Sequence, residues 1–286
     1  MKMSQLERDF ESCRLIQKKF GKSYYFSTLF FPKDIKIATH VLYAFFRVPD
    51  EIVDSNPDET LQDKKRKLEE YKTEWRNAYN NSSDNSVLRA SAFIFKKYNI
   101  PFEYSESFLD AMISDTYISR YSNYEEVKKY MYGSAAAVGL IMSHVIGFTD
   151  KGALAYAEKL GYAMQLTNFL RDIKEDYDLR GRIYLPQDEM TRFGITEENI
   201  RKHECNQGFV DFMKFQIDRA RNLYKEADAG IAMLNKSGQL PVKIASVLYA
   251  SILDKIEDLQ YDVYIKRARI SFFKRIYLAF LVIIKK

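Results

Sequence analysis

The sequence predicts an all-α fold, and three observations support that prediction. Gly and Pro together are 11 + 6 = 17 of the 286 residues, about 6%, which is roughly half their usual share and too few for a turn-rich β fold. Apolar residues recur at helical spacing along the whole chain, whereas no stretch alternates with the period of two that strands show. Hydrophobic residues make up 47% of the chain, enough to fill a large core.

The expected helices follow one another with short connections. Pro32 and Asp34 mark the start of the second helix, because a missing N–H costs little there and a carboxylate suits a helix N-terminus. The polar stretch 80–85 is a loop too short for an interdomain linker, so a single domain is expected over 1–286. The expected helical ranges are about 4–19, one starting at 32–34, then 58–79, 84–98, 103–120, 124–146, 150–178, 208–235, 239–260 and 262–284.

The positive charge is concentrated at the C-terminal end. The net charge is +5, yet seven Lys and Arg residues follow the last acidic residue, Asp262. The first 262 residues therefore carry 37 − 39 = −2, and no nucleic-acid surface is expected. The tail, residues 264–286, contains the apolar run IYLAFLVII at 276–284, too short to span a bilayer. It either packs on the core as a last helix or lies on an anionic membrane surface, and the residues leave both open.

Composition also limits the cellular setting and the metal chemistry. The first residues, MKMSQLERDF, lack the apolar segment of a signal peptide, and Cys13 and Cys205 are too few for a disulfide scaffold. A reduced, cytoplasmic setting is therefore expected, peripheral on the membrane if the tail is an anchor. The three histidines fall in no zinc-ligand spacing, so no zinc site is expected.

Two pairs of aspartates are the main candidates for a site. Asp50 and Asp54 are four residues apart, as are Asp172 and Asp176, so on a helix each pair shares a face with a rise of about 6 Å between its members. Like charges at this spacing destabilise a helix, and divalent cations would offset that cost. Mg²⁺ takes oxygen ligands and usually shares them with substrate phosphates. The pairs therefore indicate either a Mg²⁺–diphosphate site or two solvated helix faces.

The neighbours of the two pairs suit a phosphate site. Apolar and aromatic residues precede each pair, and an arginine able to bind phosphate oxygens lies beside each, Arg47 and Arg171. Asn168 and Gln165 extend the second acidic face by one turn each. These residues strengthen the case for a site without deciding between the two interpretations.

Competing motifs fail on their spacing. The GKS at 21–23 lacks the earlier glycine of a nucleotide-binding loop, because position 16 is Ile16. The DIKEDY at 172–177 begins like a calcium loop but has Lys174 at its third position and Tyr177 in place of the glycine. Neither a dinucleotide fingerprint nor a nucleophile elbow is present.

Four segments together resemble the squalene/phytoene synthase family of trans-isoprenyl diphosphate synthases, and its bacterial and archaeal phytoene synthases most. The resemblance covers about residues 10–270 and is strongest in the second acidic segment, which is similar to the family's second signature almost throughout. The segments are FGKSYYF at 20–26, YAFFRVPDEIVD at 43–54, YMYGSAAAVGLIM at 130–142 and AMQLTNFLRDIKEDYDLRGRIYLPQDEM at 163–190.

The resemblance implies a single bundle of helices around a central apolar channel, with the two aspartate motifs facing each other at its mouth. It implies Mg²⁺, or Mn²⁺ in its place, bound by Asp50, Asp54, Asn168, Asp172 and Asp176. It implies that the substrate diphosphates are held by Lys22, Ser23, Arg47, Gln165 and Arg171, with Tyr43 and Tyr249 nearby. Tyr130 and Tyr132 would lie near the reacting carbons, which adds Tyr130 to the four aspartates as a catalytic residue.

The family reaction implied is a head-to-head condensation of two geranylgeranyl diphosphates. Ionisation of the first leaves an allylic cation that alkylates the second, giving the cyclopropyl compound prephytoene diphosphate. That compound ionises, rearranges and loses a proton to give phytoene, with no reductant. Mg²⁺ and cationic side chains stabilise the departing diphosphate, aromatic faces stabilise the cation, and an apolar channel excludes water.

Several alternatives stay open beside this reading. Two farnesyl diphosphates would give a C30 product, and squalene itself would require NADPH. Some relatives are non-catalytic assembly proteins that have usually lost part of the aspartate motifs, whereas this chain keeps both. A class I terpene cyclase is disfavoured by the stretch LRDIKEDYDLRGRIYLP at 170–186. No nucleic-acid ligand and no obligate protein partner are expected.

Two features depart from the family pattern or permit two readings. Pro49 precedes Asp50 where the family commonly has a small or aliphatic residue, and inside a helix it removes a backbone hydrogen bond. We expect a kink there that shifts the first acidic cluster. The small residues at 134–139 either leave room for the substrate chain or allow close helix packing.

Overall fold

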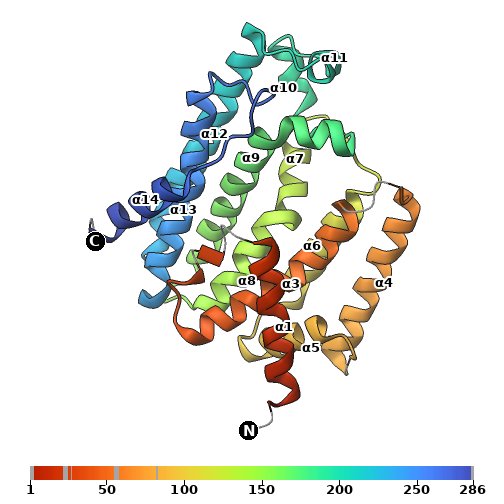
Figure 1. The fold of residues 1–286 in the computed structure, drawn as a ribbon, viewed down its shortest axis with the longest axis vertical. Coiled ribbons are helices and arrows are strands. Elements are labelled where there is room, and N and C mark those ends of the chain that lie inside the picture. The colour runs from red at the N-terminus through yellow and green to blue at the C-terminus, as the bar shows by residue number, and fades with distance from the viewer. Residues whose placement is uncertain (1–2, 22–24, 27, 55–57, 82, 285–286) are drawn as a thin grey trace.

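The computed structural model describes residues 3–21, 25–26, 28–54, 58–81 and 83–284, and it confirms the all-α prediction (Figure 1). In that part of the chain no strand is present, and two isolated bridges pair only single residues. The helices are α1 (Gln5–Phe20), α3 (Lys33–Asp54), α4 (Leu61–Asn80), α5 (Ser86–Lys97), α6 (Phe102–Ser114), α7 (Tyr124–Met131), the π-helix η1 (Tyr132–Ala136), α8 (Ala137–Ile146), α9 (Ala153–Arg180), α10 (Gln187–Arg192), α11 (Glu197–Arg201), α12 (Gln207–Ile231), α13 (Lys236–Asp258) and α14 (Phe272–Ile284).

Several boundaries differ from the sequence expectation. The range 124–146 is broken by the π-helix, and the short helices α10 and α11 were not expected. The helix expected over 262–284 begins only at 272. The chain is not helical directly after α13, because Gln260 and Tyr261 take positive φ angles of 52° and 66°. The Asp262 side chain then accepts hydrogen bonds from the backbone N–H groups of Tyr264 and Ile265, which favours a turn.

Side-chain caps fix where several helices begin. Ser4 and Glu7 form a reciprocal capping box at the start of α1, and Thr60 and Asn85 cap α4 and α5. Helix α3 continues through Pro49 to Asp54, although proline cannot donate to the carbonyl four residues back. That carbonyl, of Phe45, accepts instead from the Tyr71 hydroxyl at 3.4 Å. The first aspartate motif is therefore held on a continuous helix.

An aromatic core fixes the base of α3 against the N-terminal helices. Trp75 of α4 is fully buried, with its ring centroid 4.8 Å from Phe45 and 5.1 Å from Phe95. Its indole N–H donates to the Ser105 hydroxyl at 2.8 Å, which satisfies a polar atom that burial would otherwise leave unpaired. Large edge-to-face aromatic contacts of this kind hold α3, α4, α5 and α6 together.

Small residues let α9 approach the π-helix and α8 at backbone distance. A Cβ added at Gly161 would lie 2.7 Å from the Ala136 Cα, and one added at Gly139 would lie 2.8 Å from the Ala157 carbonyl oxygen. No side chain fits at either position without backbone movement. Ser134, Ala135 and Gly139 also line the central cavity, so the small-residue run serves both close packing and cavity space.

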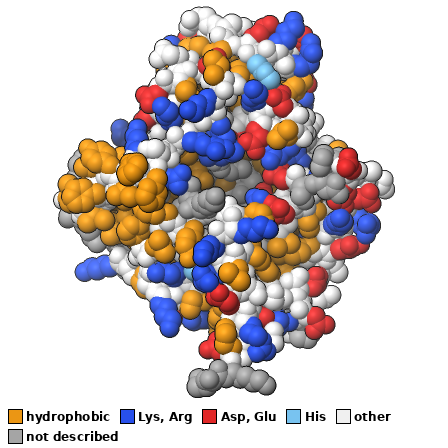
Figure 2. Space-filling view, in the orientation of Figure 1, with side chains coloured by type: hydrophobic (Ala, Val, Ile, Leu, Met, Phe, Trp, Pro, Cys, Tyr) orange, Lys and Arg blue, Asp and Glu red, His pale blue; other side chains and the backbone are white. Residues whose placement is uncertain are grey.

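The tail is partly packed and partly exposed. Ala279 of α14 is buried against Ile244 and Leu248 of α13, as a core helix requires. Most other large side chains of α14 are exposed, including Phe273 at 82%, and Figure 2 shows them as an apolar cluster at the edge of the molecule. Among the described residues no helix is long and apolar enough to cross a membrane.

Candidate active site

A single large cavity of about 950 Å³ connects the two aspartate motifs with the interior of the bundle. Most of its charged lining comes from α3 and α9, and those side chains keep contact with solvent, as with Asp54 at 27% and Glu175 at 32% exposure. Its apolar lining includes Ile146, Ala227 and Leu234, which are buried. The solvent-exposed charged residues of α3 and α9 therefore form the mouth, and the apolar residues form the depth. Figure 2 shows the corresponding face hollowed near its centre.

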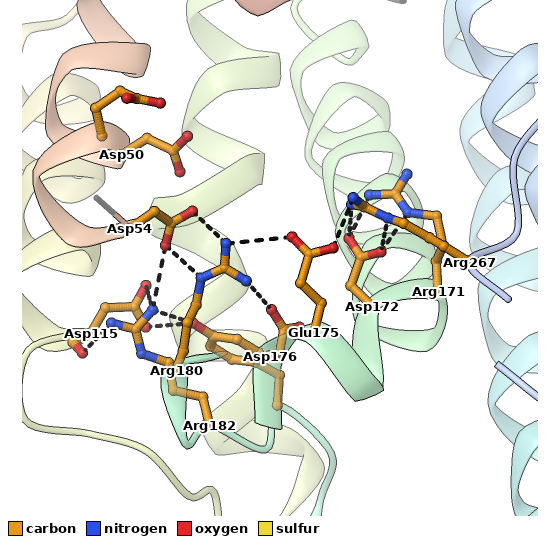
Figure 3. Close-up of polar contacts among 12 residues, drawn as sticks. Asp50, Asp54, Asp115, Arg171, Asp172, Glu175, Asp176, Arg180, Arg182 and Arg267 are labelled. Carbon is orange, nitrogen blue, oxygen red and sulfur yellow. Dashed lines mark hydrogen bonds and ion pairs between the residues drawn. The ribbon is translucent and has the colours of Figure 1, made fainter. Parts of the chain in front are cut away.

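On the α3 side, the first aspartate pair points into the mouth from successive turns. Arg47 donates to Asp50 at 2.5 Å and also pairs with Glu51 one turn on. Asp54 lies at the end of α3, and its carboxylate faces α9 (Figure 3). Asp50, Asp54 and Arg47 all line the cavity.

On the α9 side, Asp172 is the best-neutralised carboxylate. It accepts two hydrogen bonds from Arg171 at 2.6 and 2.8 Å and two from Arg267 at 2.7 and 2.8 Å. Arg267 also pairs with Glu175 at 2.8 Å. Bidentate arginine pairs are strong and directional, so the segment after α13 is held over the mouth by this contact.

Arg180 joins the two motifs across the mouth. It donates to both oxygens of Asp54 at 2.8 and 2.9 Å and to Asp176 at 3.1 Å (Figure 3). Sequence reasoning missed this residue, although it follows Asp176 by four positions and so lies on the same helix face. One guanidinium thus occupies the space between two carboxylates that were expected to share metal ions.

The pKa values of the acidic residues at the mouth are shifted in different directions. Burial and then the charge of Asp54 raise the pKa of Asp50 to about 6. Burial and then the charge of Asp172 raise the pKa of Asp176 to about 8. For Asp172, burial acts in the same direction but is outweighed by Arg171 and Arg267, so its pKa is lowered. Asp50 and Asp176 are therefore the positions where an added cation would most favour the charged carboxylate.

The donor set of the mouth fits a divalent metal. The Asn168 side-chain oxygen is buried without a hydrogen-bond partner, and it lies on α9 one turn before Asp172. Together with the aspartates it offers the oxygen ligands that Mg²⁺ prefers. No group of three or more His, Cys, Asp or Glu within the described residues is arranged to hold one ion by itself. An ion here would complete its shell with water and substrate phosphate, as Mg²⁺ commonly does.

The structure brings most of the other predicted residues to the cavity. Tyr43, Gln165, Arg171 and Tyr249 line it, whereas Tyr132 is not part of the lining. Lys22 and Ser23 lie outside the described residues, so their predicted role stays a prediction. Beside them, a Cβ at Gly21 would lie 2.7 Å from the Tyr43 ring, so glycine at this position lets the end of α1 meet Tyr43.

An aromatic wall forms one side of the cavity. The rings of Phe169 and Tyr184 stack at 4.5 Å, and Tyr130 lies 5.2 Å from Tyr184. The tyrosine hydroxyls donate to the buried Asp115, which follows α6. Sequence reasoning identified Tyr130 but missed Asp115, Arg182 and Tyr184, because no local spacing signals a contact between residues this far apart.

Two acidic helices facing each other above a deep apolar cavity define an all-α isoprenoid synthase. The chain belongs to the squalene/phytoene synthase family, whose model matches residues 17–274. The resemblance to this family that the sequence showed is therefore confirmed.

Curated relatives extend the match over nearly the whole chain. It is 30% identical to a 15-cis-phytoene synthase of Synechococcus elongatus, over 96% of this chain and 92% of that protein. It is 32% identical to a 15-cis-phytoene synthase of Synechocystis sp., over 92% and 81% of the two chains.

Solved structures agree on the fold. A dehydrosqualene synthase in complex with a ligand superposes with a TM-score of 0.89 at 25% identity, covering 98% of this chain and 97% of that one. A squalene synthase from Alicyclobacillus acidocaldarius superposes with a TM-score of 0.82 at 25% identity, covering 90% and 96%. The protein is thus a prenyltransferase of a family that generally depends on a divalent metal.

Proposed function

We propose that the protein condenses two geranylgeranyl diphosphates head to head into phytoene, through prephytoene diphosphate, with release of two diphosphates. The observation that carries this proposal is the cavity with Asp50 and Asp54 facing Asp172 and Asp176 at its mouth and apolar residues at its depth. The C20 substrate is supported by relatives named 15-cis-phytoene synthase at 30% and 32% identity, whereas the matches to C30 synthases lie at 25%.

The proposed metal is Mg²⁺, with Mn²⁺ as the alternative ion. Its ligands would be the side-chain oxygens of Asp50, Asp54, Asn168, Asp172 and Asp176. When bound, the metal supplies positive charge that stabilises the departing diphosphate. The unpartnered oxygen of Asn168 and the crowded carboxylates of Asp50 and Asp176 support this set.

The protein's own cations and polar groups would hold the two diphosphates. Arg47 and Arg171 line the mouth, and a diphosphate can accept the hydrogen bonds that they now give to carboxylates. Gln165, Tyr43 and Tyr249 offer further donors on the same lining. Lys22 and Ser23 are proposed for this role on the family resemblance alone.

The depth of the cavity suits carbocation chemistry. Its apolar lining would exclude water from the cation, and the rings of Tyr130, Phe169 and Tyr184 offer faces that attract a positive charge. Because the rearranged cation ends by losing a proton, no NADPH is required. We propose that the chain works as one domain, without an obligate protein partner or nucleic acid.

The test is an incubation of pure protein with Mg²⁺ and either geranylgeranyl or farnesyl diphosphate, with and without NADPH, read by mass spectrometry. The expected product is a C40 hydrocarbon from the C20 substrate without NADPH. Asp54→Asn should abolish it, whereas Asp218→Asn, an exposed carboxylate on α12, should not. A C30 product alone would change the assigned substrate to farnesyl diphosphate. The absence of any product from folded protein would favour a non-catalytic assembly role.

We also propose that the protein acts in the cytoplasm, peripheral on an anionic membrane through its C-terminal tail. The exposed apolar side chains of α14 follow Lys266 and Arg269 in the sequence and share the helix with Lys274 and Arg275, with no acidic residue after Asp262. Apolar insertion and attraction to anionic lipid would then act on the same helix. An insoluble hydrocarbon product could leave directly into the bilayer.

Liposome flotation tests the membrane proposal. Because Ala279 packs on α13, deleting residues 271–286 risks unfolding, so the sharper variant is Phe273→Glu with Phe280→Glu, which changes only exposed positions. We expect wild-type protein to bind vesicles containing anionic lipid and the double variant to stay in solution with unchanged turnover in detergent. Equal flotation of both proteins would exclude α14 as the anchor.

A further inference from the structure

Asp115 is a buried carboxylate shared by two tyrosines of the cavity wall. Its side chain is 5% exposed, and it lines the cavity together with Tyr130 and Tyr184. The Tyr130 hydroxyl donates to Oδ2 at 2.5 Å, and the Tyr184 hydroxyl donates to Oδ1 at 3.0 Å. Each carboxylate oxygen therefore fixes one phenol, and the short distance to Tyr130 is typical of a charge-assisted hydrogen bond.

Arg182 completes this group and connects it to the mouth. One guanidinium nitrogen donates to the Asp115 carbonyl oxygen at 2.9 Å, and the other donates to the Tyr184 hydroxyl at 3.3 Å. That second nitrogen lies 3.9 Å from a carboxylate oxygen of Asp115 and 3.9 Å from one of Asp54. A buried carboxylate needs such partners, and here they tie the aromatic wall to the first aspartate motif.

The rings held by Asp115 belong to one stack. Tyr130, Tyr184 and Phe169 lie with centroids 4.5 to 6.1 Å apart and interplanar angles of 7° to 25°. A phenol that donates to a carboxylate carries more electron density on its oxygen and ring, because hydrogen bonds in a low-dielectric interior polarise their partners. Such a ring attracts a cation over its face more strongly than a phenol hydrogen-bonded to water.

We propose that Asp115 is a positioning residue for the carbocation steps, one that fixes the Tyr130 and Tyr184 rings in the cavity wall and polarises them toward a cationic substrate carbon. This inference rests on the proposed function, because it assumes that a prenyl cation forms beside the wall. Asp115 acts through the two phenols and contributes no bond-making step. The species it favours is the prenyl cation formed during the reaction rather than a neutral prenyl chain.

A binding test separates this role from a purely structural one. The probes are the geranylgeranyl dimethylammonium ion, which carries a positive charge near C1, and neutral geranylgeraniol, each with Mg²⁺ and inorganic diphosphate present. We expect the ratio of their dissociation constants to shift against the ammonium ion by about tenfold in Asp115→Asn and in Tyr130→Phe. The ratio cancels a loss of affinity that affects both ligands equally.

Tyr121→Phe is the matched control. Its ring lies 5.6 Å from Tyr130 in the same cluster, its hydroxyl is buried without a partner, and it does not line the cavity, so we expect an unchanged ratio. Tyr130→Phe keeps the Asp115 carboxylate, so a shift there cannot come from lost charge alone. If Asp115→Asn does not fold, Tyr130→Phe and Tyr184→Phe remove the same hydrogen bonds from the other end.

An unchanged ratio in Asp115→Asn, or in both tyrosine variants, would overturn the proposal. Turnover provides a second readout, since we expect Asp115→Asn to lower kcat and raise the share of cyclopropyl diphosphate released, with little change in KM. A lowered melting temperature with the wild-type product ratio would indicate a structural role only and would also overturn it. Because the binding ratio needs no turnover, it judges this inference even if the wild-type protein makes no C40 product.

Discussion

The two aspartate pairs share a spacing but are neutralised differently. On α3, Asp54 accepts two hydrogen bonds from Arg180, while Asp50 accepts one from Arg47. On α9, Asp172 is held by two arginines, and the pKa of Asp176 is raised to about 8. Each pair thus has one member that the protein neutralises and one that it leaves crowded. The proposed metal would therefore favour the charged forms of the four carboxylates unequally, and that of Asp176 most.

The most severe test of this comparison is Asp176→Asn. We expect turnover to fall by about 10³-fold at saturating Mg²⁺, because the carboxylate that most needs an added cation is lost from the site of diphosphate departure. Product formation from geranylgeranyl diphosphate measures this, with Asp218→Asn as the control. A turnover within the range of that control would mean that the acidic pair on α9 is not part of the catalytic site.

Arg180→Ala breaks the bridge between the two pairs. The side chain is 19% exposed and contacts carboxylates of both α3 and α9, so its removal leaves Asp54 and Asp176 facing each other. We expect the metal-free protein to lose about 2 kcal/mol of unfolding free energy. Urea denaturation measures the loss, and Mg²⁺ with inorganic diphosphate should restore part of it. An equal loss with and without these ligands would contradict the idea that Arg180 stands in for a cation.

The raised pKa of Asp176 makes metal-free stability fall with rising pH. An unfolded aspartate ionises near 3.9, so between that value and about 8 the folded state binds more protons, and the free energy of unfolding decreases as pH rises. His40, with its pKa lowered to about 4, acts in the opposite direction below about pH 6.5. We therefore expect a decrease of about 1–2 kcal/mol between pH 6.5 and 8. Chemical denaturation at each pH measures it, and Asp176→Asn should make the dependence flat.

Arg267→Ala should have the smallest effect on stability. Asp172 keeps its two hydrogen bonds from Arg171, and the Arg267 side chain is 35% exposed, so solvent screens the lost pair. We expect a loss of about 0.5 kcal/mol, clearly less than that for Arg180→Ala. Side-by-side urea titrations provide the measurement. Equal losses of unfolding free energy in Arg180→Ala and Arg267→Ala would contradict the distinction between the neutralised Asp172 and the crowded Asp176.

The parts predicted correctly from sequence are those encoded locally. Helical periodicity indicates the all-α fold, and the i,i+4 spacing of Asp172 and Asp176 places both on one face of α9. The first acidic helix was also identified, and α3 runs without interruption past Pro49 to Asp54. Position-by-position signals of this kind need no knowledge of which helices meet.

The missed residues are those that act across the fold. Arg180 contacts Asp54 from 126 positions away, and Arg267 contacts Asp172 from 95 positions away. From sequence, Arg267 is one of several basic residues of the tail, with nothing to distinguish it from Arg269. The role of Asp115 can be inferred only from the packing that buries it beside Tyr130 and Tyr184. Ion pairs between distant segments carry no period, so only the assembled fold reveals them.

The contact of α9 with the π-helix and α8 has a consequence for anyone who wishes to redesign the product. At Gly161 and Gly139 the packing partner is backbone, so even a single methyl group finds no space there. At these two contacts between helices, no side chain can be enlarged to reshape the cavity. Libraries aimed at longer or shorter hydrocarbons should therefore leave these glycines untouched and vary side chains such as Val242 and Ala245 of α13, which line the same cavity.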